Sequence, residues 1–262
     1  MSSKFYPETV SEVDVPRRRS PLRFYAGAVF MIVYWPFWVL AMLMAGLLLR
    51  PFFSREKHRR IGQAMLRHGM DTFISGLETL RIIQVCDEEL RGADDRPGPL
   101  IIACNHPAMW DALLVIRRCV SVSCIMKTEL LANPLLGSGA RFAGFLPNAP
   151  RMKMVRSAIE RLKSGGRLLL FPEGTRTRRE SAGVNEFRPG LALLAEQSGA
   201  PVLPVFITTD SRYLEKGWPI WRRPVLPIRI KLSAGELIRI ESGEGVREFS
   251  ARLEGIFRKE LG

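Results

Sequence analysis

The sequence predicts an α/β fold: a central, largely parallel sheet flanked by helices, with an N-terminal membrane-embedded helical segment. Short apolar runs rich in β-branched residues alternate with helical patterns through most of the chain, which is typical of such a sheet. Residues 24–49 carry no charge, which is typical of a segment in contact with lipid. The chain has 262 residues, 47% of them apolar, which suffices for one domain and an appendage but is short for two full domains.

The N-terminal region divides into two parts. Residues 1–20 are polar and contain proline, and we expect a mobile basic tail. Residues 21–55 are expected to anchor the chain in a membrane, because their apolar run exceeds the ~20 residues that a helix needs to cross a bilayer. A cleaved secretory signal is not expected, since its apolar region would span only ~7 to 15 residues.

The path of this anchor through the membrane has two interpretations. Pro36 stands in the middle of the apolar run, where its ring and missing N–H favour a break between two short helices. Basic residues flank both ends, and a hairpin that dips into one leaflet returns both flanks to the same side. The sequence therefore favours a hairpin, and a single kinked transmembrane helix is the alternative.

The net charge of +13 predicts a polyanionic partner. The densest basic clusters, residues 17–23 and 55–60, lie on either side of the apolar run, so an anionic membrane surface is favoured over nucleic acid. The sequence contains no zinc-ligand spacing, helix-turn-helix pattern or RNA-binding aromatic motif. We therefore expect lipid, and no nucleic acid, among the partners.

Residues 56–262 are expected to form the main domain. Its first element is an amphipathic helix over residues 56–73, where apolar residues recur at helical spacing between basic ones. Strands are predicted at residues 81–85, 100–104, 120–126, 167–171, 202–207 and 228–232. Further helices are predicted at residues 152–163, 189–198 and 246–261.

The cysteines have neither paired spacing nor the density of a disulfide scaffold, and they are expected to be reduced core residues. They are Cys86, Cys104, Cys119 and Cys124. Cys104 lies two positions before a histidine and could be mistaken for a nucleophile. The apolar run before it predicts a buried strand instead, so catalysis by Cys104 is not expected.

A histidine and an aspartate follow the predicted strand 100–104. His106 stands at the carboxyl end of the strand, where ligands bind in open α/β sheets. Asp111 is expected in the first turn of a helix, from which its carboxylate can reach the imidazole Nδ1 and leave Nε2 to take a proton from a hydroxyl. Because the sequence has no G-x-S-x-G elbow, this hydroxyl is expected to belong to the substrate. A structural role for the pair is the alternative.

A second loop at a strand end supports a functional site. Residues 171–176 read Phe-Pro-Glu-Gly-Thr-Arg and follow another apolar strand. Gly174 allows an unusual backbone conformation and the close approach of a ligand. Arg176 can hold a phosphate, and Glu173 can bind a glycerol hydroxyl or orient a basic side chain. Standing alone, the loop would be interpreted as a solvated surface turn.

Together these residues resemble the glycerolipid acyltransferase family, specifically bacterial 1-acylglycerol-3-phosphate acyltransferases and related lysophospholipid acyltransferases. Asn105, His106 and Asp111 resemble the family's N-H-x-x-x-x-D motif, residues 171–176 resemble its F-P-E-G-T-R motif, and residues 202–205 resemble its fourth block. The resemblance covers most of residues 100–207. It implies an α/β fold, a short N-terminal helical membrane motif, acyl-CoA or acyl-carrier protein as donor, a lysophospholipid acceptor, and neither metal nor cofactor.

The second block of the family differs in this chain. It often ends in Asp-Arg, whereas residues 144–151 read Gly-Phe-Leu-Pro-Asn-Ala-Pro-Arg. The aspartate is missing, and Arg151 stands at an altered offset from the apolar residues. An acceptor other than lysophosphatidate, such as a lyso-aminolipid, therefore remains open.

The resemblance implies an O-acyltransferase that moves a fatty acyl group to the free hydroxyl of a lysophospholipid, foremost 1-acylglycerol-3-phosphate, to give phosphatidate. It also implies a catalytic domain at the cytoplasmic face of the inner membrane. The expected catalytic residues are His106 and Asp111, and the expected substrate-binding residues are Asn105, Arg151, Glu173, Gly174, Thr175 and Arg176. A non-catalytic membrane-surface protein is the competing interpretation, but it leaves both motif loops unexplained.

Overall fold

The computed structural model describes residues 19–90, 98–134, 136–178, 181, 183–213, 215, 217–218 and 222–262. Residues 1–18 of the expected tail therefore lie outside the described residues. The helices are α1 (Pro21–Leu48), α2 (Arg55–Thr79), α3 (Asp111–Ile116), α4 (Thr128–Ala132), α5 (Leu136–Phe142), α6 (Arg151–Lys163), α7 (Gly190–Ser198) and α8 (Val246–Leu261). The strands are β1 (Ile83–Cys86), β2 (Leu100–Cys104), β3 (Val122–Met126), β4 (Leu146–Pro147), β5 (Arg167–Leu170), β6 (Val202–Thr209) and β7 (Ile228–Ala234).

Within the described residues, one sheet holds the strands in the order β1-β7-β6-β2-β5-β3-β4. All neighbouring pairs are parallel except β6 with β7, which are antiparallel. The prediction of an α/β fold with a largely parallel sheet is thus confirmed. The predicted strands all overlap observed ones, whereas β4, α4 and α5 were not predicted because each is only two to seven residues long.

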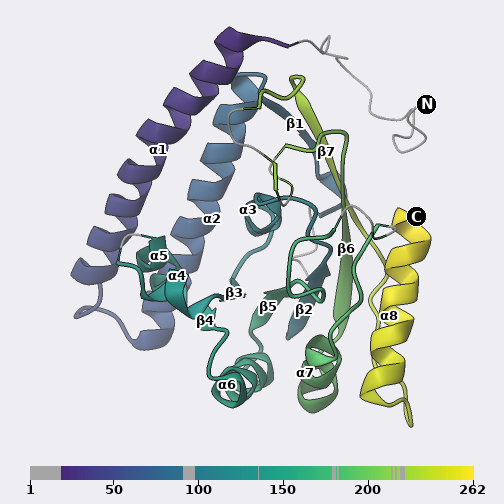
Figure 1. Cartoon of the computed structure of the whole chain (residues 1–262). Helices are drawn as coiled ribbons and strands as arrows, with labels where there is room; N and C mark the ends of the chain where they lie inside the picture. The colour runs from purple at the N-terminus through teal and green to yellow at the C-terminus, as the bar shows by residue number, and fades with distance from the viewer. Residues whose placement is uncertain are drawn as a thin grey trace.

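The sheet separates two apolar cores, as the alternating side chains of β2 illustrate. Leu100, Ile102 and Cys104 belong to the core shared with α2 and α3. Ile101 and Ala103 point the other way, into the core shared with α6, α7 and α8. Helices therefore cover both faces of the sheet (Figure 1), which explains why β2 is apolar at every position.

The expected membrane segment is one continuous helix, so the expected break at Pro36 is wrong. α1 runs for 28 residues and lies antiparallel beside α2 (Figure 1). Packing on both sides of Pro36 keeps the helix continuous: the Phe30 ring lies over Gly76, and the Trp38 ring lies over Gly69. A Cβ added to Gly69 would lie 2.0 Å from Trp38, so only glycine allows this approach.

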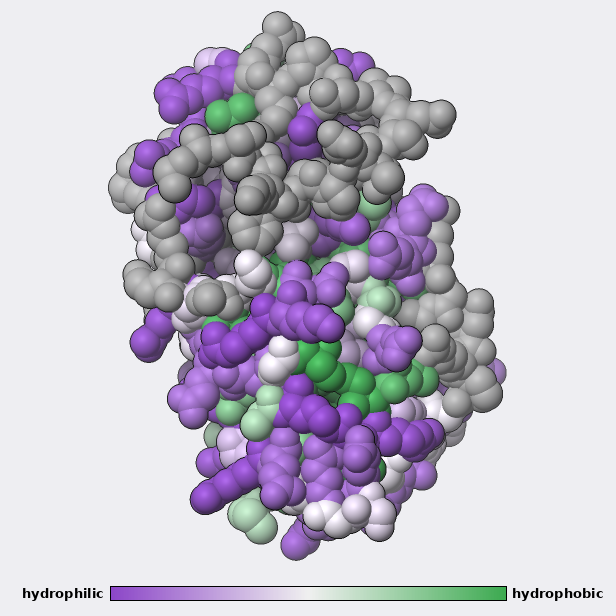
Figure 2. Space-filling view, turned by 90° about the vertical axis from the view of Figure 1, so that its right-hand side faces the viewer, coloured by the Kyte–Doolittle hydropathy of each residue, from purple (hydrophilic) through white to green (hydrophobic). Residues whose placement is uncertain are grey.

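α1 exposes one apolar face along its whole length. Of the sixteen exposed large apolar side chains in the described part of the chain, ten lie on α1: Leu22, Tyr25, Val29, Ile32, Val33, Phe37, Leu40, Met44, Leu47 and Leu48. Their spacing of mostly three or four residues places them on one side of the helix. Figure 2 views the molecule from the side away from α1, and its surface is mostly hydrophilic. By length and composition, α1 is also the one described helix that could cross a bilayer.

Candidate active site

The predicted histidine–aspartate pair is formed at the carboxyl end of β2. His106 Nδ1 lies 2.8 Å from Asp111 Oδ2. Asp111 is the first residue of α3, as expected, and the same oxygen accepts a 2.7 Å hydrogen bond from the Ala108 N–H. The His106 side chain is 22% exposed and that of Asp111 only 2%. The carboxylate thus favours the tautomer protonated at Nδ1 and leaves Nε2 for a substrate.

The buried position of Asp111 shapes its ionisation. Burial raises the pKa of this carboxyl to about 6, against hydrogen bonds from His106 and Ala108 that lower it. The carboxylate is therefore ionised at neutral pH but not at mildly acidic pH. An ionised carboxylate in this position stabilises the imidazolium that forms when His106 takes a proton.

The two motif loops are neighbours because β2 and β5 pair in parallel. Their carboxyl ends meet at one edge of the sheet, which brings residues 105–111 beside residues 171–177. The Phe171 ring stacks on the His106 imidazole with a centroid separation of 4.2 Å and an interplanar angle of 22°. This contact fixes the plane of the imidazole at the edge of the sheet.

Glu173 joins the two motif loops to each other. Its side chain is buried, and Oε1 accepts hydrogen bonds from the His106 N–H at 2.9 Å and the Thr177 hydroxyl at 2.7 Å. Oε2 accepts from the Asn185 N–H at 3.0 Å. Both oxygens thus bind the protein's own loops and position the backbone of His106, and the expected contact with a glycerol hydroxyl stays a prediction.

Asn105 has a positioning role in the fold, and its expected contact with substrate stays a prediction. Its side chain is buried, and its amide exchanges two hydrogen bonds with the backbone of Ile207 in β6, at 2.8 and 2.7 Å. These bonds extend the pairing of β2 with β6 by one residue. They hold the chain in place immediately before His106.

Thr177 contributes to the site and was not predicted. Its N–H donates to the His106 carbonyl at 2.8 Å, and its hydroxyl lies 3.2 Å from the His106 N–H. Thr177 follows the Phe-Pro-Glu-Gly-Thr-Arg motif directly, but nothing in the sequence near it indicates a partner 71 positions away.

The remaining predicted substrate-binding residues lie around the mouth of the site or apart from it. Gly174 is exposed with φ +66°, and Thr175 and Arg176 are partly exposed beside it. Arg151 is exposed at the start of α6. Among the described residues, Arg151 forms no hydrogen bond or ion pair with His106 or with residues 171–176, and its role stays a prediction.

Cys104 is confirmed as a core residue. It is fully buried at the end of β2, and all four cysteines are free thiols. Burial raises the pKa of the Cys104 thiol well above its usual value, which disfavours the thiolate that a nucleophile requires.

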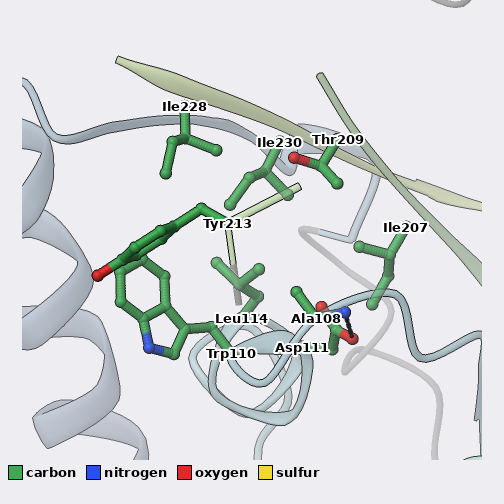
Figure 3. A pocket seen from close by; sticks show the side chains of 9 residues that line it. All are labelled: Ala108, Trp110, Asp111, Leu114, Ile207, Thr209, Tyr213, Ile228 and Ile230. Atoms are coloured by element: carbon green, nitrogen blue, oxygen red, sulfur yellow. Dashed lines mark hydrogen bonds between the residues drawn. The ribbon is translucent and has the colours of Figure 1, made fainter. Parts of the chain in front are cut away.

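A small apolar pocket opens beside the pair. It is lined by Ala108, Trp110, Asp111, Leu114, Ile207, Thr209, Tyr213, Ile228 and Ile230. Figure 3 shows the Trp110 and Tyr213 rings together at one side and the aliphatic side chains of Ile228 and Ile230 at another. Four lining side chains carry polar groups, namely Asp111, Thr209, Tyr213 and Trp110, but most of the lining is hydrocarbon and aromatic carbon, so the pocket suits an apolar ligand.

The sequence of this chain is similar to sequences of known acyltransferases. The sequence profile of the family described as "Acyltransferase" matches residues 85–208, which include both motif loops. A 1-acyl-sn-glycerol-3-phosphate acyltransferase of Pseudomonas aeruginosa is 28% identical over 174 residues, covering 64% of this chain and 65% of that protein. A lyso-ornithine lipid O-acyltransferase of the same organism is 30% identical over 161 residues, covering 59% of this chain and 60% of that protein. The chain thus spans less than two thirds of the length of the curated relatives it matches.

A solved structure shares the fold. The crystal structure of the 1-acyl-sn-glycerophosphate acyltransferase of Thermotoga maritima superposes with a TM-score of 0.68 and 22% sequence identity, covering 92% of this chain and 94% of that one. The profile match, the similar relatives and the shared fold agree with the two motif loops at the carboxyl edge of the sheet. Residues 85–208 of this chain thus match the acyltransferase family, and the chain shares the fold of the Thermotoga maritima protein.

Proposed function

We propose that the chain is an O-acyltransferase that moves a fatty acyl group from acyl-CoA or acyl-carrier protein to the hydroxyl of a lysophospholipid. The observation that carries this proposal is the 2.8 Å contact between the partly exposed His106 and the buried Asp111. The favoured acceptor is 1-acylglycerol-3-phosphate, and the product is phosphatidate. The relative of Pseudomonas aeruginosa bearing that name supports this choice.

The proposed reaction is a direct transfer with His106 as the proton carrier. Nε2 takes the proton of the acceptor hydroxyl while the hydroxyl oxygen attacks the thioester carbonyl carbon. The tetrahedral intermediate then collapses, the carbon–sulfur bond breaks, and the departing thiolate takes the proton back from Nε2. Asp111 stabilises the imidazolium between these two steps.

Two features support a lipid acceptor. The apolar pocket beside Asp111 suits part of a fatty acyl chain, because burial of hydrocarbon away from water is favourable. Arg176 stands in the loop next to His106 and provides the planar donor pair that phosphate oxygens accept. Arg151, Gly174 and Thr175 are retained as candidates for contact with the headgroup.

The arrangement of α1 favours insertion into one leaflet over a full crossing. α1 packs along α2, which carries charged residues such as Arg60 and Asp71. α2 also contributes to the apolar core that it shares with α3 and one face of the sheet. A crossing α1 would bring these charges and the sheet beside it into hydrocarbon, at a high energetic cost. A helix lying in the interface instead buries only its exposed apolar face. The favoured side is the cytoplasmic face of the inner membrane, where the thioester donors are found.

Labelling in sealed vesicles tests this arrangement. Cysteines at positions 19 and 52 flank α1, and both native residues there are exposed. With Cys86 replaced by serine, Arg19→Cys and Phe52→Cys are expected to react with a membrane-impermeant thiol reagent from the same side. Reaction from opposite sides would establish a crossing and contradict the proposal.

A second acceptor has specific support. The lyso-ornithine lipid O-acyltransferase is a relative at 30% identity, and the aspartate of the second motif block is missing here. An amino-acid headgroup carries no phosphate. The arginines around the site would therefore bind a phosphate in lysophosphatidate but not in lyso-ornithine lipid.

A thiol-release assay on the purified chain tests the function. Acyl-CoA and acyl-carrier protein are supplied in turn against lysophosphatidate and lyso-ornithine lipid, with His106→Ala beside the wild type. Release that needs lysophosphatidate and is lost in the variant is the expected result. Release with lyso-ornithine lipid alone would keep the reaction and replace the acceptor. Absence of release with every pair would overturn the proposal.

A further inference from the structure

Two arginines from different helices converge over one glycine. Arg59 lies near the start of α2, and Arg161 lies in the last turn of α6. A Cβ on Gly144 would lie 2.6 Å from Arg59 Cδ and 3.4 Å from Arg161 Nη1. Gly144 has φ +71°, so the left-handed backbone and the lack of a side chain both favour glycine where these arginines meet.

The Arg161 guanidinium has no carboxylate within 4.0 Å among the described residues. Its Nη1 donates to Ser123 Oγ at 2.9 Å, and Gln63 Nε2 lies 3.0 Å from the same oxygen. Both Gln63 and Ser123 are buried. Burial, and next the charge of Arg59, lower the pKa of Arg161 to about 10. The protein's own groups therefore leave this cation incompletely compensated.

Arg59 has an incomplete set of partners as well. Its terminal nitrogen pairs with Glu56, but Glu56 also pairs with Arg60 at 2.9 Å, so one carboxylate serves two cations. The Arg59 Nε is buried and has no hydrogen-bond partner. Buried donors in folded proteins are nearly always hydrogen-bonded. An anion between the two guanidinium groups would provide an acceptor and offset both charges.

This cluster lies at the edge of the sheet opposite to His106. Ser123 is the second residue of β3, Gly144 precedes the start of β4, and Arg161 precedes β5. All three therefore stand toward the amino ends of parallel strands, whereas His106 follows the carboxyl end of β2. An anion bound here is not the acceptor lipid in the catalytic site.

We propose that Arg59 and Arg161 form a binding site for a phosphate group at the amino edge of the sheet. Guanidinium groups bind phosphate through paired hydrogen bonds, and two of them can contact the same group from different sides. The phosphate of an anionic membrane lipid is the favoured source. Arg59 lies just beyond the turn from α1 to α2, where Phe52 is 78% exposed and the apolar face of α1 ends. A free phosphate ion offers the same chemistry from solution.

A pair of double variants with equal charge tests the site. Arg59→Gln with Arg161→Gln removes two charges from the proposed site. Arg60→Gln with Arg156→Gln removes two charges from the same helices, and both control residues are exposed. Each purified full chain is sedimented with vesicles of phosphatidylcholine, with or without phosphatidylglycerol. Thermal unfolding is measured in inorganic phosphate and in chloride at equal ionic strength.

The site variant is expected to partition onto phosphatidylglycerol vesicles about tenfold more weakly than the control variant, with equal binding to pure phosphatidylcholine. That result supports a lipid phosphate. Equal vesicle binding, with a phosphate-dependent rise in Tm that only the site variant loses, supports a free phosphate ion. Equal losses in both variants and no phosphate-dependent rise in Tm overturn the site, because diffuse charge would then explain the binding.

A third variant covers the case in which the glutamine substitutions disturb folding. Arg59→Lys with Arg161→Lys keeps both charges but removes the planar donor pairs. It is expected to lose several-fold in phosphate-dependent binding while keeping its affinity for pure phosphatidylcholine vesicles. Binding equal to the wild type in both vesicle and phosphate experiments would overturn the proposal. These readouts need no turnover, so they do not depend on the proposed acyl transfer.

Discussion

The charged side chains at the two edges of the sheet differ in how completely they are hydrogen-bonded and paired. At the carboxyl edge, Asp111 accepts hydrogen bonds from His106 and Ala108, and Glu173 accepts three more from its neighbours. At the amino edge, Arg59 and Arg161 lie close together. Their guanidinium groups have too few hydrogen-bond acceptors and too little compensating negative charge. A preorganised polar network favours chemistry that moves a proton between fixed groups. A site with uncompensated charge favours a ligand that supplies the missing charge.

The largest effect is expected from His106→Ala, which removes the proposed base. General-base catalysis contributes typically ~10² to 10⁴ in rate, so kcat in the thiol-release assay should fall by at least that factor. The control is His68→Ala, because His68 is exposed on α2. If His106→Ala kept wild-type turnover, the carboxyl edge of the sheet would not be a catalytic site with His106 as its base.

Asp111→Asn should come next, with a change in pH dependence. In the wild type, kcat/KM is expected to fall as the pH drops through about 6, because the carboxyl then binds a proton. The asparagine variant should lose ~10²-fold or more in kcat at neutral pH. Its kcat/KM should also not show the fall at acidic pH that protonation of this carboxyl causes. An unchanged profile would contradict the role of the carboxylate.

Stability gives an independent check on the same carboxyl. Its folded pKa of about 6 lies above the ordinary value of 3.8, so the folded state binds the proton more tightly than the unfolded chain. The stabilising contribution of the protonated form is therefore present below 3.8 and is lost as the pH rises to about 6. Urea denaturation across this window should show a smaller pH-dependent loss in Asp111→Asn than in the wild type.

Thr177→Val should have a smaller effect, because the Thr177 hydroxyl bonds groups of the protein that position His106. The loss of its hydroxyl removes contacts to the His106 N–H and to Glu173. We expect kcat to fall about tenfold with KM nearly unchanged, and Thr177→Ser to restore most of the rate. A rise in KM alone, or failure of serine to restore turnover, would show that Thr177 acts otherwise.

The smallest effect is expected at the amino edge. Arg161→Gln should change the free energy of unfolding by less than about 1 kcal/mol, because a partly desolvated charge facing another cation contributes little. Glu173→Gln should cost about 1 to 3 kcal/mol, since it disturbs three hydrogen bonds from partly buried donors to a buried carboxylate. Urea denaturation of both variants measures the difference. Equal costs would mean that the two edges do not differ as described.

The sequence predicted elements whose signal is local. Residues 100–104 and 246–261 were predicted with their observed bounds, because a buried parallel strand is apolar throughout and an amphipathic helix has a regular period. The pairing of His106 with Asp111 was also predictable, since only five residues separate them.

Features that depend on distant partners could not be predicted. Asn105 bonds a residue 102 positions away, and Glu173 bonds one 67 positions away, so the sequence did not indicate their contacts with the protein's own backbone. The break at Pro36 was wrong for a related reason. Rings packed against α2 outweigh the local preference of proline, and those contacts join residues 31 to 46 positions apart.

The close packing of α1 on α2 would also determine how deep the chain reaches into a lipid leaflet in the proposed arrangement. Gly69 and Gly76 each accommodate one aromatic ring, so α1 has a single register along its neighbour. A shift by one helical turn, ~5.4 Å, would press those rings against larger side chains. The distance between the exposed apolar face of α1 and His106 is therefore fixed by the fold. In the proposed arrangement, an acceptor hydroxyl at a different depth in the leaflet would not reach His106, whatever its chemical reactivity.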